Sequence, residues 1–520
     1  MENNGSANGL MEEAQGLVTE PSSQTGEKEL AERDRKREKK KREKTIKRRN
    51  RPVRKLPLAW ALIILGLTFA AASAVFVLFF VNRGQAAQAA AGAVLVLLMG
   101  FGAFSVYGAL RQKELLSTLR RTLFICVCLL AAVLPLPVTM GIDLGFMPFL
   151  LAILLLVLMS NEKVAMLAAL PVACAAALTA GILGADDCSQ TAAVLTVIVT
   201  SLTAVFALNI RKTRSSTVIA AALAGIAGVV TYCAVMLAGG QLYLSYWRTL
   251  LWILGSCIAC GVLAVGLMPL FETVFDVASD ARLNELLNNN NPLIRRLMTE
   301  APGTYHHSLL VASLAEAAAE EVGANALLVR VAACYHDVGK LRSPLCFKEN
   351  QKHDRNIHDE LDPYESAKRI IAHQQDGVTL LEKHKLPRDV IRIVGEHHGD
   401  SVMVYFYDKA KRMAPEGTTV DEEAFRYPSH KPRSKESAIL MLADCCEAAV
   451  RSMSNPTMQD IENKVREVIT HKWDKRGSML WDSPLTFTDI KAIEKSFIKT
   501  FAALNHERVE YPALEEIDVR

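Results

Sequence analysis

The strongest constraint on this chain is a stretch of 214 residues, from Pro57 to Leu270, that contains only 15 charged residues. The charges are bunched, and the apolar runs between them are about 17–25 residues long, the length needed to cross a hydrocarbon core of about 30 Å. A large soluble protein does not repeat charge-free runs of this length so often. The stretch therefore predicts a membrane module and not the buried helices of a soluble globule.

Eight membrane spans are predicted from these runs, at 57–81, 87–110, 122–140, 144–160, 164–184, 190–210, 216–239 and 247–270. The third run contains Pro135 and Pro137 and the fourth is short, so a re-entrant hairpin is the alternative for this pair. No ionisable residue lies in the middle of a span, which disfavours a transport site.

The loops between the spans predict the orientation of the module. With the N-terminus inside, the inner loops 111–121, 161–163 and 211–215 carry 4, 1 and 3 basic residues. The outer loops carry only Arg83, with Arg248 just past the last of them. Because Lys and Arg accumulate in cytoplasmic loops, this arrangement is the favoured one. An even number of spans then places both termini in the cytoplasm.

A basic arm precedes the first span, since residues 33–55 contain 15 Lys or Arg and 3 Asp or Glu. The rest of the chain has 44 basic and 52 acidic residues, so the net charge of +4 does not indicate binding to a nucleic-acid duplex. The arm is either a plain topology signal or a segment that contacts anionic lipid. Residues 1–55 are expected to form a disordered, basic cytoplasmic arm.

The second half of the chain has a different pattern, and all 12 histidines lie in it, at or beyond His306. Amphipathic helical patterns alternate with Gly, Pro and polar loops, and neither an alternating strand pattern nor a G-x-G-x-x-G motif occurs. This half is therefore predicted to be all-α. The expected boundaries are 56–270 for the spans, 271–300 for a linker helix, 301–510 for the helical domain and 511–520 for a tail.

Seven side chains in this half are of metal-ligand types and stand in conspicuous places. They are His307, His336, Asp337, His373, His397, His398 and Asp444. The pairs His336-Asp337 and His397-His398 each end an apolar helical pattern, where packing alone does not explain them. Asp444 follows a run of apolar residues, where an unpaired carboxylate would cost several kcal/mol without a cation or a metal.

Seven ligands are too many for one metal ion, whereas two ions that share Asp337 would use all of them. Paired metals about 3.5–4 Å apart suit in-line attack on a phosphoryl group. Imidazole and carboxylate ligands without thiolate favour Mn or Fe, with Zn as the alternative. Lys340 is either an electrostatic clamp for phosphate or a solvated lysine at a helix end.

These motifs resemble those of a known family. His307, the run His336-Asp337-Val338-Gly339-Lys340 and Asp444 are similar to the H…HD…D pattern of HD-superfamily metal-dependent phosphohydrolases. The match is closer to the membrane-anchored HD phosphodiesterases that hydrolyse cyclic di-AMP, and it covers about residues 57–510. The segments that carry this closer resemblance are 300–308, 335–340, 395–399 and 432–438.

The resemblance implies roles for the seven ligands. One ion would be bound by His307, His336, Asp337 and Asp444, and the other by Asp337 as the bridge with His373, His397 and His398. The family's activity implies attack by a metal-bridged hydroxide on one phosphodiester bond, which gives the linear dinucleotide. We assign catalytic roles to Asp337 and Lys340.

Two departures qualify the resemblance. Members of this family usually carry a large extracytoplasmic domain after the first span, whereas here only a short loop joins Val81 to Ala87. In addition, no G-Y-P follows His397-His398, in contrast to HD proteins that cleave cyclic di-GMP.

The loop from Asp408 to Lys435 is long and polar. We expect it to overhang the metal site, so that Arg433 and Lys435 contact phosphate together with Lys340; a disordered surface insert is the alternative. His306 is expected beside a ligand without binding metal. The remaining histidines, expected at the surface, are His353, His358, His384, His430, His471 and His506.

Together these features predict a polytopic transmembrane helix bundle followed by an all-helical HD-type metallophosphohydrolase domain. The predicted function is hydrolysis of cyclic di-AMP, with two divalent metal ions, at the inner face of a bacterial cell membrane. One alternative is another nucleotide substrate, such as cyclic di-GMP or a guanosine polyphosphate. Another is a receptor that binds nucleotide without turnover. Formation of a homodimer stays open.

Overall fold

The computed structural model describes residues 56–82, 87–111, 118–210, 213–241, 243–351, 356–473, 478–481 and 483–504. Within these residues every regular element is a helix, apart from one isolated β-bridge between Val402 and Arg426. This confirms the predicted all-α class. The basic arm and the C-terminal tail lie outside the described residues.

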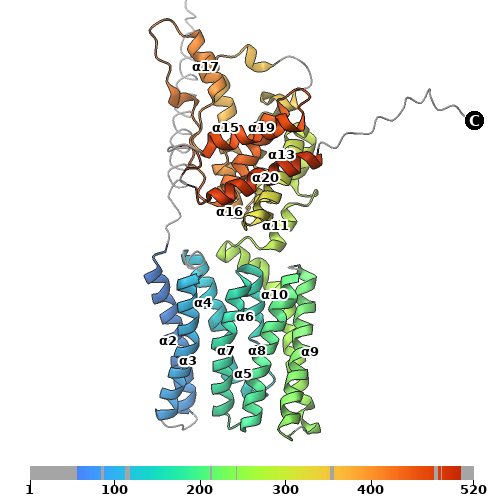
Figure 1. The fold of residues 1–520 in the computed structure, drawn as a ribbon. Coiled ribbons are helices and arrows are strands. Elements are labelled where there is room, and N and C mark those ends of the chain that lie inside the picture. Colours follow the sequence, from blue (N-terminus) through green and yellow to red (C-terminus); the bar gives the residue numbers. More distant parts are fainter. Residues whose placement is uncertain are drawn as a thin grey trace, which may run out of the picture.

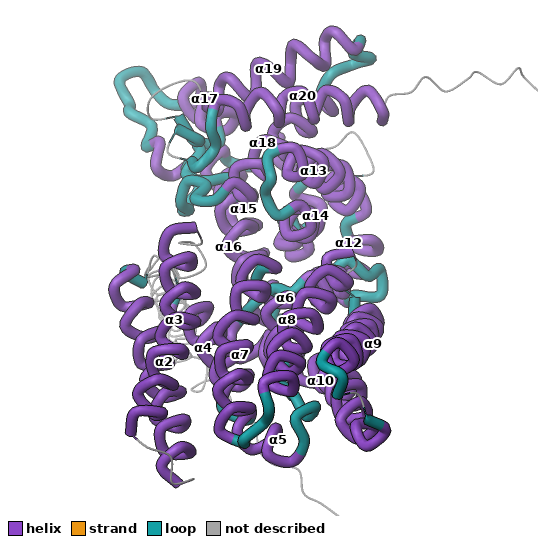
Figure 2. The backbone as a smooth tube through the Cα atoms, turned by 60° about the horizontal axis from the view of Figure 1, so that its bottom comes forward, coloured by secondary structure: helices purple, strands orange, loops and turns teal. Residues whose placement is uncertain are grey.

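The helices form two parts that are stacked end to end, a bundle of long helices and a second, more irregular helical part (Figure 1). The bundle consists of α2 (Leu58–Asn82), α3 (Ala87–Arg111), α4 (Leu119–Val133), α5 (Leu136–Ile142), α6 (Leu150–Met159), α7 (Glu162–Ile182), α8 (Asp187–Ile210), α9 (Arg214–Ala238) and α10 (Trp247–Phe275). Figure 2 shows the same bundle with its far end turned forward and the second part behind it.

Six helical segments of the described bundle are long and apolar enough to cross a membrane. They are α2, α4 together with α5, α7, α8, α9 and α10 with the short turn before it. Two further apolar stretches are shorter, Val94–Leu110 within α3 and the whole of α6. Each of the eight predicted spans therefore coincides with a helix or a helix pair, and α6 is the one among these helices and pairs in the described bundle that is far too short to cross a membrane.

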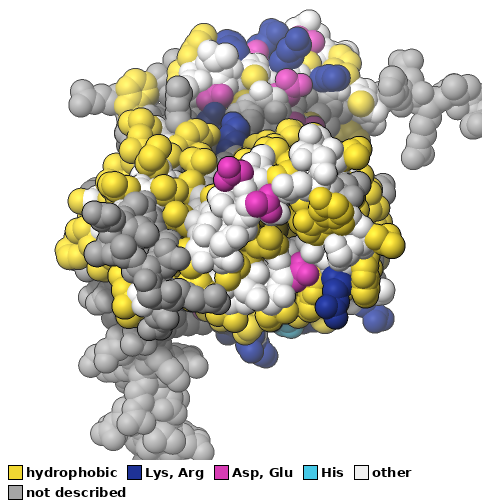
Figure 3. Space-filling model, turned by 90° about the horizontal axis from the view of Figure 1, so that it is seen from below, with side chains coloured by type: hydrophobic (Ala, Val, Ile, Leu, Met, Phe, Trp, Pro, Cys, Tyr) yellow, Lys and Arg dark blue, Asp and Glu magenta, His cyan; other side chains and the backbone are white. Residues whose placement is uncertain are grey.

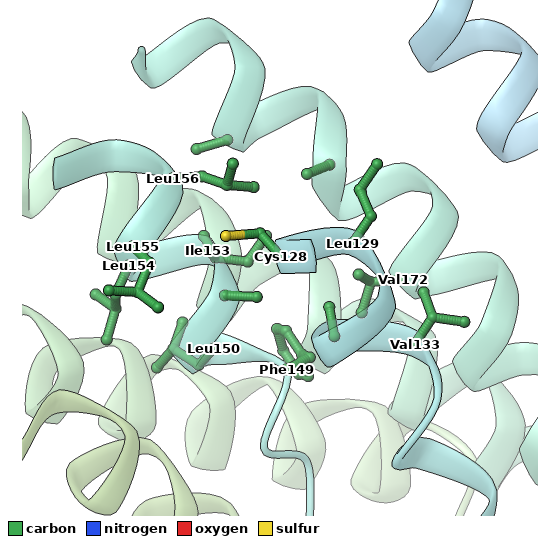
Figure 4. Packing of buried hydrophobic residues seen from close by; sticks show 14 of the residues in the cluster. Cys128, Leu129, Val133, Phe149, Leu150, Ile153, Leu154, Leu155, Leu156 and Val172 are labelled. Carbon is green, nitrogen blue, oxygen red and sulfur yellow. The ribbon is translucent and has the colours of Figure 1, made fainter. Parts of the chain in front are cut away.

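The fourth predicted span is an interior helix. Its helix, α6, has ten residues, or about 15 Å, and nine of these residues are buried. Figure 4 shows Leu150 and Ile153 of α6 packed among Cys128 and Leu129 of α4 and Val172 of α7. A segment that is too short to cross the bilayer is tolerated where protein surrounds it, so the neighbouring helices support α6.

Proline explains the interruption before α6. Pro135 is the N-cap of α5 and Pro137 lies in its first turn, so α4 ends at Val133 and the chain restarts as a separate short helix. In place of two uninterrupted spans, this region thus contains a break between α4 and α5, followed by the short buried helix α6.

The outward faces of the bundle are apolar. Leu67, Leu78, Val230, Leu237 and Val262 are all more than half exposed, which is expected of side chains that face lipid. Seen along the bundle, yellow hydrophobic side chains surround the rim, while acidic side chains are few on this face (Figure 3). The bundle is therefore built to be covered by a membrane.

The second part comprises α11 (Asp280–Leu286), α12 (Pro292–Glu300), α13 (Pro302–Glu321), α14 (Ala326–Tyr335), α15 (Pro363–Lys383), α16 (Arg388–Glu396), α17 (Val404–Met413), α18 (Lys435–Arg451), α19 (Met458–Trp473) and α20 (Phe487–Leu504). It has its own hydrophobic core, separate from that of the bundle, with Val331, Ile393 and Leu442 at its centre. Two separate cores indicate two domains.

The segment expected as one linker helix, 271–300, contains the end of α10 and two short helices, α11 and α12. The asparagines at 288–291 interrupt the helical pattern, and Asn291 then caps α12 by accepting a hydrogen bond from the backbone N–H of Leu293. Leu283 and Leu297 from these helices are buried in the second core. The linker is thus partly built into the helical domain.

Ion pairs join the two domains. Asp276, directly after α10 and in the left-handed region with φ 55°, contacts Arg120 at 2.8 Å and Arg388 at 2.9 Å. Arg120 is the second residue of α4, and Arg388 is the first residue of α16. A second pair, Arg121 with Asp389 at 3.3 Å, connects the same two helices. The end of the membrane bundle therefore contacts the start of α16 directly.

Candidate metal centre

Five helices deliver the seven predicted ligands to one place. The ligands are His307 in α13, His336 and Asp337 after α14, His373 in α15, His397 and His398 after α16, and Asp444 in α18. All are buried except His398, whose side chain is 22% exposed. Residues that are 137 positions apart in the chain thus meet in the interior of the second domain.

Local sequence explains how these helices present the ligands. Asp362 caps α15 by accepting from the N–H of Tyr364, and Pro363 occupies its first turn. Gly399, at φ 58°, turns the chain away just after His398. Gly339 is required by packing, because a Cβ atom there would lie 1.8 Å from the carbonyl oxygen of His373. The HD run is thereby held against α15.

The potential ligand atoms form three overlapping groups, each with all its atoms within 4.8 Å of one another. The groups are His307, His336 and Asp444; His373, His397 and His398; and His336, Asp337 and His397. Asp337 faces both sides, because its Oδ2 lies 3.2 Å from Nε2 of His336 and its Oδ1 lies 3.3 Å from Nε2 of His373. This geometry suits a carboxylate shared by two ions.

The histidine rings are held in one tautomer. In His336, His373 and His397 the Nδ1 atom lies 2.8, 2.6 and 2.5 Å from the backbone carbonyl oxygen three residues earlier. Since a carbonyl only accepts, Nδ1 carries the proton and Nε2 has a free lone pair. These three Nε2 atoms are buried without a hydrogen-bond partner. Buried polar atoms normally have partners, so this donor set fits metal binding.

His307 has a different support. Its Nδ1 lies 2.5 Å from Oε2 of Glu447, and its Nε2 lies 3.1 Å from Oδ1 of Asp444. Burial lowers the pKa of His307, but the hydrogen bonds with Asp444 and Glu447 outweigh it and raise that pKa to about 9. Glu447 was not among the predicted site residues. Its spacing of three from Asp444, which puts both on one face of α18, is the signal that could have identified it.

The other charges of the site are consistent with neutral imidazoles beside carboxylates. Burial, with His336 and His373 adding to it, lowers the pKa of His397 to about 3, so this ring is neutral at physiological pH. Burial opposes ionisation of Asp337, but His336 and Lys340 outweigh it and hold the pKa of this carboxyl well below its ordinary value. Neutral imidazole and ionised carboxylate are the forms that bind metal.

Lys340 lies at the edge of the ligand cluster. Its Nζ is 2.7 Å from Oδ2 of Asp337 and 2.6 Å from Oε1 of Glu349, and it lies 4.8 Å from the centre of the Phe347 ring. Burial opposes the charge on Lys340, yet Asp337 and Glu349 raise its pKa above the ordinary value. The predicted clamp is therefore a permanent cation next to the shared carboxylate.

The two other residues predicted to contact phosphate, Lys435 and Arg433, do not lie at the edge of the ligand cluster as Lys340 does. The Lys435 ammonium is 3.0 Å from Asp489 and 3.2 Å from the backbone carbonyl oxygen of Val322. Arg433 is exposed, and its backbone N–H donates to Glu396. Within the described residues, neither side chain has a contact with the seven ligands.

The loop that contains these residues does reach the centre through Tyr427. Its ring lies 4.4 Å from the ring of His398 and 6.1 Å from that of His373. Phe425 of this loop packs with Phe406 of α17 in a small core against α15. The loop is therefore an ordered cover in this structure, although the side chain that approaches the ligands is an aromatic one that was not predicted.

The remaining histidines were expected at the surface, and this prediction is wrong for one of them. His358 is buried, and its Nε2 lies 2.8 Å from the carbonyl oxygen of Cys346. His353 and His506 lie outside the described residues. The error arises because a short helical turn packs His358 against Phe406, a contact that sequence spacing does not show.

A cavity of about 210 Å³ borders His373. Its lining includes Phe347 and Gly339, the basic residues Arg342, Lys368 and Arg369, and the acidic residues Glu365 and Asp376. Arg342 is paired with Asp376 at 2.8 Å, and Arg369 with Glu365 at 2.9 Å. The cavity thus lies beside the candidate ligand His373 and has a mixed, charged lining.

Comparison with known proteins identifies both parts of the chain. Residues 86–279 match the family described as 7TM receptor with intracellular HD hydrolase, and residues 304–449 match the HD domain. The chain thus joins a membrane module of the 7TM-HD type to an HD domain, and we refer to it as the 7TM-HD chain. The first match begins just before α3, so α2 precedes the seven helical units α3, α4–α5, α6, α7, α8, α9 and α10. This 7TM-HD protein is a multi-span membrane protein with an intracellular HD domain.

Similar proteins include two named cyclic-di-AMP phosphodiesterase PgpH. The Bacillus subtilis protein is 48% identical over 257 residues, 49% of this chain and 35% of the relative. The Listeria monocytogenes protein is 36% identical over 372 residues, 71% of this chain and 49% of the relative. The 7TM-HD chain thus spans between about a third and half of the length of these relatives.

Solved structures of the Listeria HD domain are also similar. One is 40% identical, covers 42% of this chain and 100% of the solved chain, and has a TM-score of 0.39. Another, in complex with cyclic di-AMP, is 41% identical, covers 42% of this chain and 99% of the solved chain, and has a TM-score of 0.40.

Proposed function

We propose that this 7TM-HD protein is a membrane-bound, metal-dependent phosphodiesterase that hydrolyses cyclic di-AMP to the linear dinucleotide. The observation that carries the proposal is the pair of ligand groups on either side of Asp337. In each group, all the potential ligand atoms lie within 4.8 Å of one another. The similarity to relatives named for this activity supports the substrate.

The residues divide into two ligand sets. His307, His336 and Asp444 would hold one divalent ion, His373, His397 and His398 the other, and Asp337 would serve both. Such ions supply an activated water and offset the negative charge of a phosphodiester. Nitrogen and oxygen ligands without thiolate favour Mn or Fe, with Zn as the alternative. Asp337 and Lys340 have the catalytic roles, since the Lys340 cation holds the shared carboxylate and lies beside the phosphate position.

Substrate contacts follow from the cations around this centre. We assign Lys340 to the scissile phosphate, because its Nζ lies 2.7 Å from Oδ2 of Asp337, the carboxylate proposed to serve both ions. Arg433 is free to turn toward a bound nucleotide, whereas Lys435 would first have to leave Asp489. We place the second half of the dinucleotide in the cavity beside His373, where Phe347 offers a ring surface and Arg369 a positive charge.

The location proposed for the enzyme is the cytoplasmic membrane of a bacterium, with both termini inside. Arg120, Arg121 and Arg214 lie at the end of the bundle nearest the HD domain, which agrees with the tendency of basic residues to stay inside. The basic arm at 33–55 would then face anionic lipid. A homodimer is compatible with this arrangement.

The test uses the full chain purified in detergent and loaded with Mn²⁺. It is incubated separately with cyclic di-AMP, cyclic di-GMP and a guanosine polyphosphate, and products are separated by chromatography. We expect the linear dinucleotide from cyclic di-AMP, and none from a matched variant with His336→Ala and Asp337→Ala. Faster turnover of another nucleotide would change the substrate only. Full metal occupancy without turnover of any of them would refute the enzyme and favour a nucleotide receptor.

A further inference from the structure

The candidate ligand histidines differ in the hydrogen-bond partner of the ring nitrogen that faces away from the metal centre. For His336, His373 and His397 the far nitrogen donates to a neutral backbone carbonyl. For His307 it donates to the Glu447 carboxylate at 2.5 Å. Within the described residues, Glu447 is the one carboxylate bonded to the far side of a ligand ring, so one ligand group has a charge that the other lacks.

Glu447 is placed to act through His307. It follows Asp444 by three residues on α18, so both carboxylates project from the same face toward α13. The side chains of His307 and Glu447 are each 3% exposed. Among Lys and Arg side chains, Arg451 is the one paired with Glu447, 3.6 Å from Oε1, and Oε1 has no hydrogen-bond partner. The His307 ring is therefore the main partner of this buried carboxylate, which is stabilised by positive charge on that ring or bound to it.

The carboxylates that touch the ligands directly divide differently between the groups. Asp337 faces His336 with one oxygen and His373 with the other, so it is shared. Asp444 has Oδ1 3.1 Å from His307 and belongs to the group of His307 and His336, although its Oδ2 lies 3.8 Å from His398. Asp444 therefore favours the group of His307, and Glu447 adds a second carboxylate to the same side. A carboxylate behind a histidine fixes the ring and makes its free nitrogen a stronger donor.

We propose that Glu447 is a positioning residue that holds the His307 ring with Nε2 turned toward Asp444, and that it makes the ion bound by His307, His336 and Asp444 the tighter of the two. This inference rests on the proposed metal centre and goes beyond it, because it ranks the two sites. The centre then fills in order, first beside α13 and α18, and afterwards beside α15 and α16.

Metal titration tests the ranking without reference to turnover. The full chain in detergent is stripped with a chelator and titrated with Mn²⁺, and free Mn²⁺ is followed by electron paramagnetic resonance. The wild type is expected to bind in two steps. Glu447→Gln keeps an acceptor for the His307 ring but removes the charge, and should weaken only the tighter step, by about tenfold. Glu447→Leu removes both and should weaken that step by up to about 100-fold.

The weaker step is the internal control, because a variant that retains it has a folded ligand cluster. It should stay within about threefold of the wild type in Glu447→Gln. The matched control is Glu316→Gln on α13, where the same chemical change affects a half-buried pair with Arg330; both steps should be unchanged. Two equal sites in the wild type, or equal weakening of both steps in Glu447→Gln, would overturn the inference. No Mn²⁺ binding at all would instead refute the proposed function.

Discussion

The Lys340 ammonium lies 2.7 Å from the Oδ2 atom of Asp337, the carboxylate that stands between the two ligand groups. A cation at this position does two things at once. It holds this carboxylate in its ionised form, and in the proposed reaction it would add positive charge beside the phosphodiester. Glu349, 2.6 Å away on the other side, keeps the lysine side chain from swinging into solvent.

Lys340→Gln should lower kcat for cyclic di-AMP by about 10–1000-fold, because the developing charge on phosphate loses a nearby cation. Metal content should remain near that of the wild type, since no ligand is removed. Steady-state kinetics and elemental analysis of the same sample measure both. Lys348→Gln, an exposed neighbour, is the control. An unchanged kcat in Lys340→Gln would show that this lysine is only structural.

Arg369→Gln tests the cavity beside His373. If the second nucleotide lies there, the variant should raise KM for cyclic di-AMP about tenfold, the effect of losing one charge-assisted hydrogen bond of about 1.5 kcal/mol, and leave kcat nearly unchanged. Initial rates over a range of substrate concentrations give the two constants. A fall in kcat without a change in KM would place the arginine outside the substrate site.

The pH dependence of the metal-free protein follows from His307. Its pKa is raised from 6.5 to about 9, so its contribution to stability is complete below pH 6.5 and is lost as the pH rises through 9. We expect the unfolding temperature of the chelator-stripped HD domain, within the full chain, to fall between pH 6.5 and 9. Because metal must displace this proton, apparent Mn²⁺ affinity should rise between pH 7 and 8.5. Opposite trends would show that His307 is neutral.

The junction between the domains gives another prediction. Asp276 binds both Arg120 and Arg388, so Asp276→Asn should loosen the first turn of α16. Hydrogen exchange of the full chain should become several-fold faster at the start of α16, the helix that ends before His397. Glu467→Gln, which removes an exposed pair with Lys464, should leave that helix unchanged. Equal exchange in Asp276→Asn and the wild type would mean that the ion pairs contribute nothing to the contact.

The sequence was sufficient for features with a strong local signal. His336-Asp337 and His397-His398 stand where apolar helices end, and the structure brings both pairs into one ligand cluster. Charge-free runs likewise marked every helix of the bundle. Pro135 and Pro137 made a re-entrant hairpin the alternative for the third and fourth spans, and the helix breaks at these prolines.

Tertiary contacts account for the rest. The pairing of Lys435 with Asp489 joins α18 to α20, and no spacing along the chain predicts it. The burial of α6 depends on the helices that surround it, since its sequence is equally compatible with a lipid-facing span. Tyr427 reaches His398 only because Phe425 is buried against α15. Such relationships depend on the packing of distant segments, which periodicity does not reveal.

Turnover and metal content, measured together, test the paired-ion centre most directly. The stripped full chain is titrated with Mn²⁺, and cyclic di-AMP hydrolysis is recorded at each metal content. We expect little product at one ion per chain, and full activity with the linear dinucleotide as product at two. Maximal activity at one ion, or no hydrolysis at two, would contradict a centre of paired ions around Asp337.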